Sequence, residues 1–185
     1  MSRIAVPNLE DAPEGSKEGL AAVYAQLGVV PNLFRLIASS PAALTGFLNF
    51  SGALKKTLDV KTRERIALAV AQVNGCDYCL SAHTFLATNL AKLSPEEIAQ
   101  NRNGRSSDAK ADAAVAFARK VTLEHGHVSE GDLAEVRIAG FHDGEIVEII
   151  ALVAENQDRH RLSGRPCERT GTSRLTYSGR SWGAG

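Results

Sequence analysis

The sequence has 185 residues, and its 21 Lys and Arg side chains balance its 21 Asp and Glu side chains. That length suits one domain, or one domain with an arm, and the lack of a basic excess argues against a nucleic-acid-binding protein. No run approaches the about 18 consecutive apolar residues of a membrane-spanning helix. Three cysteines are too few for a disulfide scaffold, so paired cysteines would indicate redox catalysis or metal binding instead.

Helical periodicity dominates the first part of the chain. Apolar residues recur at positions i, i+3, i+4 and i+7 between a proline that suits a first helical turn and a glycine that suits a helix end. These residues are Leu20, Val23, Tyr24 and Leu27, between Pro13 and Gly28. A turn over residues 30–34 precedes renewed helical spacing through Leu36 and Ile37, and Pro41 opens a further helix with apolar residues as far as Leu54.

Two helices are predicted in the middle of the chain. Residues 61–73 are largely apolar, which favours a central, buried helix. Gly75 ends this helix, and a second one is expected to start near Cys76 and to run to Leu90 or Leu93.

The remaining elements are also predicted to be helical. Residues 94–97 form a capping box with proline at the first helical position, so a short helix follows before a loop at 101–104. Helical patterns then cover residues 108–124 and 129–139, and Asp143 caps a final helix. No segment alternates apolar and polar residues long enough to indicate a strand, so the fold class is all-α.

The two ends of the chain differ from its body. The first fifteen residues contain no apolar run, so we expect no secretory signal and a cytoplasmic protein. Residues 1–155 carry a net charge of −4, with 15 basic and 19 acidic residues, whereas residues 156–185 carry +4, with six Arg and two acidic residues. We therefore predict a helical domain over 1–155 and a flexible, basic Arg/Ser/Gly-rich arm over 156–185, in which Cys167 is incidental.

The chemistry-bearing residues lie around the junction of the two middle helices. Cys76 and Cys79 are spaced to close a short disulfide ring at a helix start, where the helix N-terminus favours a thiolate. His83 lies one turn after Cys79 and could accept its proton. If the two helices pack antiparallel, Glu64 returns beside His83 and orients it. A carboxylate, an imidazole and a thiol in series are typical of an activated nucleophile.

Each of these residues also has a simpler interpretation. A single Cys-x-x-Cys pair occurs in structural and metal sites as well, a histidine on an amphipathic helix is often a surface residue, and Glu64 alone could be a solvated charge. Tyr78, between the cysteines, suits packing better than catalysis. Cys76, Cys79 and His83 could supply three zinc ligands, but the sequence offers no evident fourth. The combination is more specific than any of its parts.

The combination also resembles a known family. The pattern Glu64, eleven residues, Cys-Asp-Tyr-Cys over 76–79, three residues and His83 resembles the alkylhydroperoxidase D family, also called carboxymuconolactone decarboxylase-like, and in particular its peroxidase-related members. Three further stretches are similar to the same subfamily: Leu-Gly-Val-Val-Pro-Asn-Leu-Phe-Arg at 27–35, Asp-Ala-Lys-Ala-Asp-Ala-Ala at 108–114 and Gly-Glu-Ile-Val-Glu-Ile-Ile at 144–150. The resemblance covers about residues 3–154.

The resemblance implies an all-α, alkylhydroperoxidase D-like helical bundle that assembles into homo-oligomers, trimers or hexamers. It also implies an antioxidant thiol peroxidase, with Cys79 as the peroxidatic cysteine and Cys76 as the resolving cysteine. His83 and Glu64 would form the proton relay, and a dithiol protein would reduce the resulting disulfide. No cofactor, metal, nucleic acid or membrane is implied.

Two departures from the family pattern bear on this expectation. In the founding branch the residue before the second cysteine is a histidine of the relay, whereas this chain has Tyr78, whose phenol cannot act as a base at neutral pH. The tail after residue 155 also lacks the usual helical continuation. In addition, the helix N-terminus by itself favours Cys76 as the nucleophile, while the spacing of His83 favours Cys79.

Three other functions remain compatible with the sequence. The pair could serve a thiol–disulfide oxidoreductase without peroxidase activity. The chain could instead be a metal-binding or a non-enzymatic helical oligomer. Decarboxylation, after which part of the family is named, fits less well because that branch does not rely on a Cys-x-x-Cys pair and no separate lactone-binding signature is evident.

Overall fold

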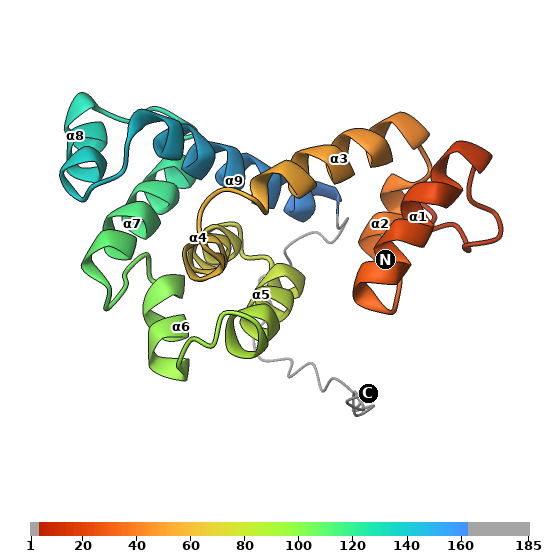
Figure 1. Cartoon of the computed structure of the whole chain (residues 1–185), viewed down its shortest axis with the longest axis horizontal. Coiled ribbons are helices and arrows are strands. Elements are labelled where there is room, and N and C mark those ends of the chain that lie inside the picture. Colours follow the sequence, from red (N-terminus) through yellow and green to blue (C-terminus); the bar gives the residue numbers. More distant parts are fainter. Residues whose placement is uncertain (1–3, 163–185) are drawn as a thin grey trace.

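A computed structural model describes residues 4–162, with the side chains of residues 160–162 left out. These residues form helices and no strand, which confirms the all-α prediction (Figure 1). In chain order the helices are α1 (Glu14–Leu27), α2 (Asn32–Ile37), α3 (Pro41–Leu54), α4 (Val60–Val73), α5 (Asp77–Asn89), α6 (Pro95–Arg102), α7 (Ala109–Leu123), α8 (Glu130–Ile138) and α9 (Asp143–Leu162).

Helix α4 is the centre of the fold. Its start is fixed by Asp59, whose carboxylate accepts hydrogen bonds from the backbone N–H groups of Lys61 and Thr62. Ile66 and Val70 are fully buried, and α5, α6, α7 and α9 all pack against this one helix. The prediction of a central, buried helix is therefore confirmed. An apolar surface on nearly every side explains why so many helices can pack against α4.

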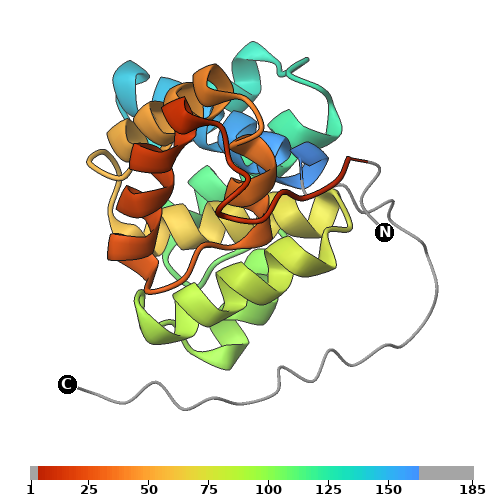
Figure 2. The same ribbon diagram turned by 90° about the vertical axis from the view of Figure 1, so that its right-hand side faces the viewer.

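The helices enclose separate hydrophobic clusters. The main one joins α4, α7 and α9, with Phe117, Ala118 and Ile149 among its buried members. A second cluster joins α1, α2 and α3 around Leu20 and Leu44. Figure 1 shows α1 and α2 at one end of the molecule, α6 to α8 at the other, and α3 and α9 between them. Figure 2 views the molecule from the end formed by α1 and α2.

The start of α6 corrects one detail of the sequence prediction. Ser94 caps the helix as expected, because its hydroxyl accepts a hydrogen bond from the backbone N–H of Glu97 at 3.2 Å. The Glu97 carboxylate, however, does not return to the backbone of Ser94. It points into the protein and bonds to Arg65, because a buried guanidinium needs a charged acceptor.

Helix α9 extends beyond the change in composition at residue 155. The predicted boundary at residue 155 falls inside this helix, which continues to Leu162. Arg159 donates a hydrogen bond to Glu155 at 2.6 Å and to Ser51 at 3.1 Å, and its guanidinium lies 5.1 Å from the centre of the Phe47 ring. These contacts with α3 hold the last turns of the helix after its apolar periodicity has ended.

The division into a domain over 1–155 and an arm over 156–185 stays a prediction. Residues 163–185 lie outside the described residues, and with them lie Cys167 and most of the predicted arm.

Candidate active site

The cysteine pair occupies the junction between α4 and α5. Gly75 adopts a left-handed backbone with φ of 61°, a conformation that glycine reaches without a Cβ clash, and this turns the chain after α4. Cys76 is the N-cap residue of α5, and its Sγ accepts a hydrogen bond from the backbone N–H of Cys79 at 3.2 Å. The two cysteines form a disulfide, with their Cα atoms 5.2 Å apart. The junction thus places both sulfurs at the positive end of α5.

A carboxylate and an imidazole from two different helices meet next to this junction. Helix α5 packs along α4, and the Nδ1 atom of His83 lies 2.9 Å from Oε2 of Glu64. Both side chains are mostly buried, with about a tenth of each exposed. Because the carboxylate accepts, Nδ1 is the donor, and Nε2 is left as the ring nitrogen that can receive a proton. The predicted meeting of Glu64 with His83 is therefore present in the structure.

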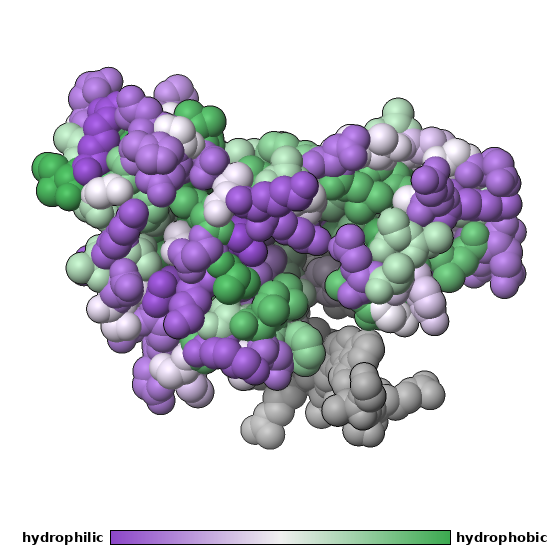
Figure 3. Space-filling model, in the orientation of Figure 1, coloured by the Kyte–Doolittle hydropathy of each residue, from purple (hydrophilic) through white to green (hydrophobic). Residues whose placement is uncertain are grey.

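The surroundings of the sulfurs are apolar. Cys76 and Cys79 are 5% and 6% exposed and form a small cluster with Ala71 and Leu80. Tyr78, between them, is 41% exposed. Other large apolar side chains of this region are also exposed, among them Phe85 and Leu90, and hydrophobic residues gather over α5 in Figure 3. The helix that carries the disulfide and the residue after it therefore leave several large apolar side chains exposed in the single chain.

The sequence analysis missed a buried ionic network on the other side of α4. Arg65 donates to Glu97 at 2.9 Å, and the same carboxylate accepts hydrogen bonds from Asn101, Ser106 and Ser107 at 2.5–3.0 Å. Burial opposes ionisation of this carboxyl group, but the hydrogen bonds from Ser106, Ser107 and Asn101 prevail and lower the pKa of Glu97 to about 2. In the sequence, the adjacent Ser106 and Ser107 before α7 were the one feature that could have indicated a buried acceptor such as Glu97. Through Arg65, which directly follows Glu64 in the sequence, this network connects α4 to α6.

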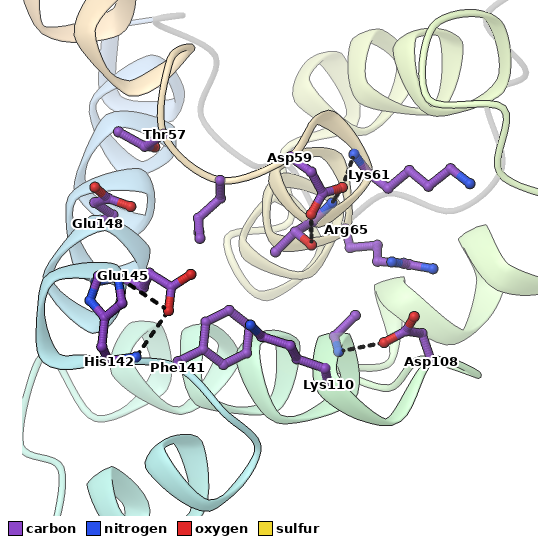
Figure 4. A pocket seen from close by; sticks show the side chains of 13 residues that line it. Thr57, Asp59, Lys61, Arg65, Asp108, Lys110, Phe141, His142, Glu145 and Glu148 are labelled. Atoms are coloured by element: carbon purple, nitrogen blue, oxygen red, sulfur yellow. Dashed lines mark hydrogen bonds and ion pairs between the residues drawn. The ribbon is translucent and has the colours of Figure 1, made fainter.

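A cleft of about 620 Å³ lies apart from the cysteine pair. Its lining comes from the starts of α4, α7 and α9 and the loops before them, and includes neither the cysteines nor His83 (Figure 4). Asp59 and Asp108 cap the adjoining helices, and Glu145 accepts a hydrogen bond from the backbone N–H of His142. Lys110 lies 4.4 Å from the centre of the Phe141 ring. Most charges around this cleft thus already have partners within the chain.

Two further findings bear on the alternatives left open by the sequence. Within residues 4–162, no group of three or more His, Cys, Asp and Glu residues is arranged to hold a metal ion, and Cys76, Cys79 and His83 do not form such a group. In the same part of the chain, every helix is too short or too polar to cross a lipid bilayer.

Comparison with known proteins finds a family match for the residues of this site. The model of the carboxymuconolactone decarboxylase family matches residues 41–124, a span that includes Glu64, both cysteines of the pair and His83. This segment is therefore similar to members of the carboxymuconolactone decarboxylase family. No curated protein matches the chain significantly.

Several solved structures are similar to this chain over more than the segment that the family model matches. An uncharacterised peroxidase-related protein from Ralstonia eutropha JMP134, with an alkylhydroperoxidase AhpD core, is 28% identical, with a TM-score of 0.76 over 89% of this chain and 92% of that one. A peroxidase-related protein from Silicibacter sp. TM1040 is 25% identical, with a TM-score of 0.75 over 88% of each chain. The debrominase Bmp8, in complex with 2,3,4-tribromopyrrole, is 19% identical over 88% of this chain and 90% of that one, with a TM-score of 0.72, and shares the fold. The chain therefore has an alkylhydroperoxidase D-like helical fold.

Proposed function

We propose that this protein is a thiol peroxidase that reduces hydroperoxides through the Cys76–Cys79 pair. The observation that carries the proposal is the arrangement of a disulfide at the start of α5, one helical turn from His83, which is itself hydrogen-bonded to Glu64 at 2.9 Å. A redox-active pair beside a carboxylate-oriented imidazole provides both the electrons and the proton transfer that peroxide reduction needs. The peroxidase-related descriptions of two similar solved structures support the same class.

In the first half of the cycle, Cys79 is the peroxidatic cysteine. Its proton passes to Nε2 of His83, and the thiolate attacks the terminal oxygen of the hydroperoxide. The O–O bond breaks, Cys79 becomes a sulfenic acid, and the leaving alkoxide takes the proton from His83 to form the alcohol. Glu64 holds the ring and stabilises its charged form while the proton is on it.

In the second half, the electrons are replaced. Cys76 is the resolving cysteine: its thiolate attacks the sulfur of the sulfenic acid, hydroxide leaves as water, and the disulfide forms. A dithiol protein then reduces the disulfide and becomes oxidised itself. We also propose that the enzyme is cytoplasmic, because dithiol proteins are kept reduced in that compartment. We further propose a homo-oligomer, trimeric or hexameric, in which the exposed apolar side chains of α5 become covered.

A thiol titration tests the proposal. The reduced full chain is treated with one equivalent of cumene hydroperoxide, beside the variants Cys76→Ser, Cys79→Ser and Cys167→Ser. We expect the loss of two thiols per chain, dependent on Cys79 and unaffected by Cys167→Ser. In Cys76→Ser, a sulfenic acid should persist and react with dimedone. If no thiols are lost, the peroxidase proposal is wrong, and turnover of small disulfides by the same protein would favour the oxidoreductase without peroxidase activity.

A further inference from the structure

The two sulfurs of the pair are held in different ways. Cys76 is the N-cap residue of α5, and its Sγ accepts the backbone N–H of Cys79 at 3.2 Å. Among the described residues, no donor to the Sγ of Cys79 is found. The two cysteine residues are buried to the same degree, at 5% and 6% exposed, so a difference in their burial does not compensate for this asymmetry. A negative charge left on one sulfur of the broken disulfide is therefore stabilised better on Cys76.

The charged groups around the pair leave this asymmetry in place. On α4, the carboxylate of Glu64 is hydrogen-bonded to Nδ1 of His83 at 2.9 Å. On α5, Asp77 stands in the first turn and is exposed, so water screens its carboxylate. The positive end of the helix and the N–H of Cys79 remain as the fixed groups directed at Sγ of Cys76.

We propose that the reductant attacks Cys79, and that Cys76 leaves as the thiolate. The inference rests on the proposed function, because it concerns the step that returns the oxidised pair to its reduced form. It assigns Cys79 as the sulfur that meets the external reagent in both halves of the cycle. Cys76 then exchanges bonds only with Cys79.

The step balances as a thiol–disulfide exchange. A thiolate of the dithiol attacks Sγ of Cys79, the bond between Cys76 and Cys79 breaks, and its electron pair moves to Sγ of Cys76. The second thiolate of the reductant then attacks the reductant's own sulfur in the mixed disulfide. Cys79 is released with the electron pair and is protonated through Nε2 of His83 by a proton that the reductant's thiol has given up, so two electrons pass from the dithiol to the protein.

The choice of sulfur follows from the stability of the leaving group. Exchange is faster when the departing thiol has the lower pKa, and the attacked sulfur is the one whose partner leaves more readily. A thiolate on Cys76 keeps the hydrogen bond that this sulfur already has in the disulfide, so no backbone change is needed. The same thiolate is then ready to attack the sulfenic acid of Cys79 in the next cycle.

Trapping the mixed disulfide tests the inference directly. The full chain with Cys167→Ser is oxidised with diamide, exposed briefly to excess glutathione, quenched with acid and blocked with N-ethylmaleimide. Fragmentation of the peptide that contains both cysteines locates the two adducts. We expect glutathione on Cys79 and N-ethylmaleimide on Cys76, in an excess of about tenfold or more over the reverse arrangement. Equal amounts, or glutathione mainly on Cys76, would overturn the inference.

A second measurement removes the dependence on one trapping reaction. Thiolate absorbance at 240 nm is followed against pH in Cys79→Ser and in Cys76→Ser, both with Cys167→Ser, after circular dichroism has shown that each variant is helical. The backbone N–H of residue 79 is kept in both variants, so the thiolate of Cys76 should appear at the lower pH. The reverse order would contradict the inference.

These tests separate the inference from the proposed function, because neither uses peroxide. A protein that consumes no hydroperoxide but carries glutathione on Cys79 would disprove the peroxidase and retain the order of exchange. A protein that consumes hydroperoxide but carries glutathione on Cys76 would retain the peroxidase and disprove the order of exchange.

Discussion

Two neighbouring residues of α4, Glu64 and Arg65, serve two different regions of the molecule. Glu64 reaches α5 and contacts the ring of His83 at 2.9 Å. Arg65 reaches α6 and binds Glu97, a carboxylate that also accepts hydrogen bonds from Asn101 and two serines. One carboxylate thus has an imidazole that can exchange protons, and the other is saturated with donors that cannot. The comparison separates a site suited to proton transfer from an ion pair that fixes the fold.

The comparison is tested most severely by removing the proton relay. We expect His83→Ala and Glu64→Gln to lower kcat/KM for cumene hydroperoxide by about 10²-fold or more, because the thiol loses its base or the base loses its orientation. The matched control is Glu97→Gln, the same change in the other carboxylate. This control should keep its activity per folded molecule. Unchanged rates in both relay variants would remove Glu64 and His83 from the mechanism.

The next largest effect is expected on stability, in the other region. Glu97→Ala leaves the guanidinium of Arg65 buried without its partner, which should lower the free energy of unfolding by about 3–5 kcal/mol. Urea unfolding followed by circular dichroism measures this loss. A loss below about 1 kcal/mol, as for an exposed ion pair, would show that the network around Glu97 does not fix the fold.

The lowered pKa of Glu97 makes the contribution of this network to the free energy of unfolding depend on pH. Its pKa is lowered from 4.5 to about 2, so the unfolded chain binds more protons in this range and the folded state gains stability as pH rises. This contribution is complete above about pH 4.5 and is lost as pH falls towards 2. We expect Glu97→Gln to flatten the dependence of the free energy of unfolding on pH within that window.

Asp132 provides a control for this pH experiment. Hydrogen bonds from Lys120 and Ser129 lower its pKa to about 2 as well, so Asp132→Asn should remove a separate part of the same slope. A slope that stays unchanged in Glu97→Gln, but falls in Asp132→Asn, would assign the acid sensitivity to α8 rather than to the network at α4.

The smallest effect is expected at an exposed ion pair. Lys17 and Glu14 lie 2.6 Å apart on α1, with half or more of each side chain exposed. Solvent screens such a pair, so Lys17→Ala should change the urea midpoint very little. A loss comparable with that of Glu97→Ala would mean that burial is not what distinguishes the ion pairs of this protein.

Much of the site could be predicted because it is local. The spacing of Cys76, Cys79 and His83 is set by one helix, and the glycine before them marks where that helix starts. The contact between Glu64 and His83 was conditional on how α4 and α5 pack, and the two helices do pack against each other. The family pattern supplied the roles of these residues, which remain a proposal.

Other features could not be predicted, for physical reasons that particular residues illustrate. Ser94 and Glu97 have the spacing of a capping box, but spacing does not tell whether a carboxylate turns back to the helix or inwards to a buried arginine. The change in composition after residue 155 suggested the end of a helix. Contacts of Arg159 with Ser51 and Phe47, on a helix far away in the sequence, continue α9 instead.

The sequence by itself determined the helices, the central place of residues 61–73, and the cysteine pair at a helix start, because apolar period, caps and glycines act over a few neighbouring residues. Only the tertiary structure decided which partner each charged side chain of α4 takes. Glu64 and Arg65 are adjacent in the chain, but they leave the helix in different directions and meet groups from α5 and α6. A charge chooses its partner by distance and burial in the folded protein, and neither quantity is written in the order of the residues.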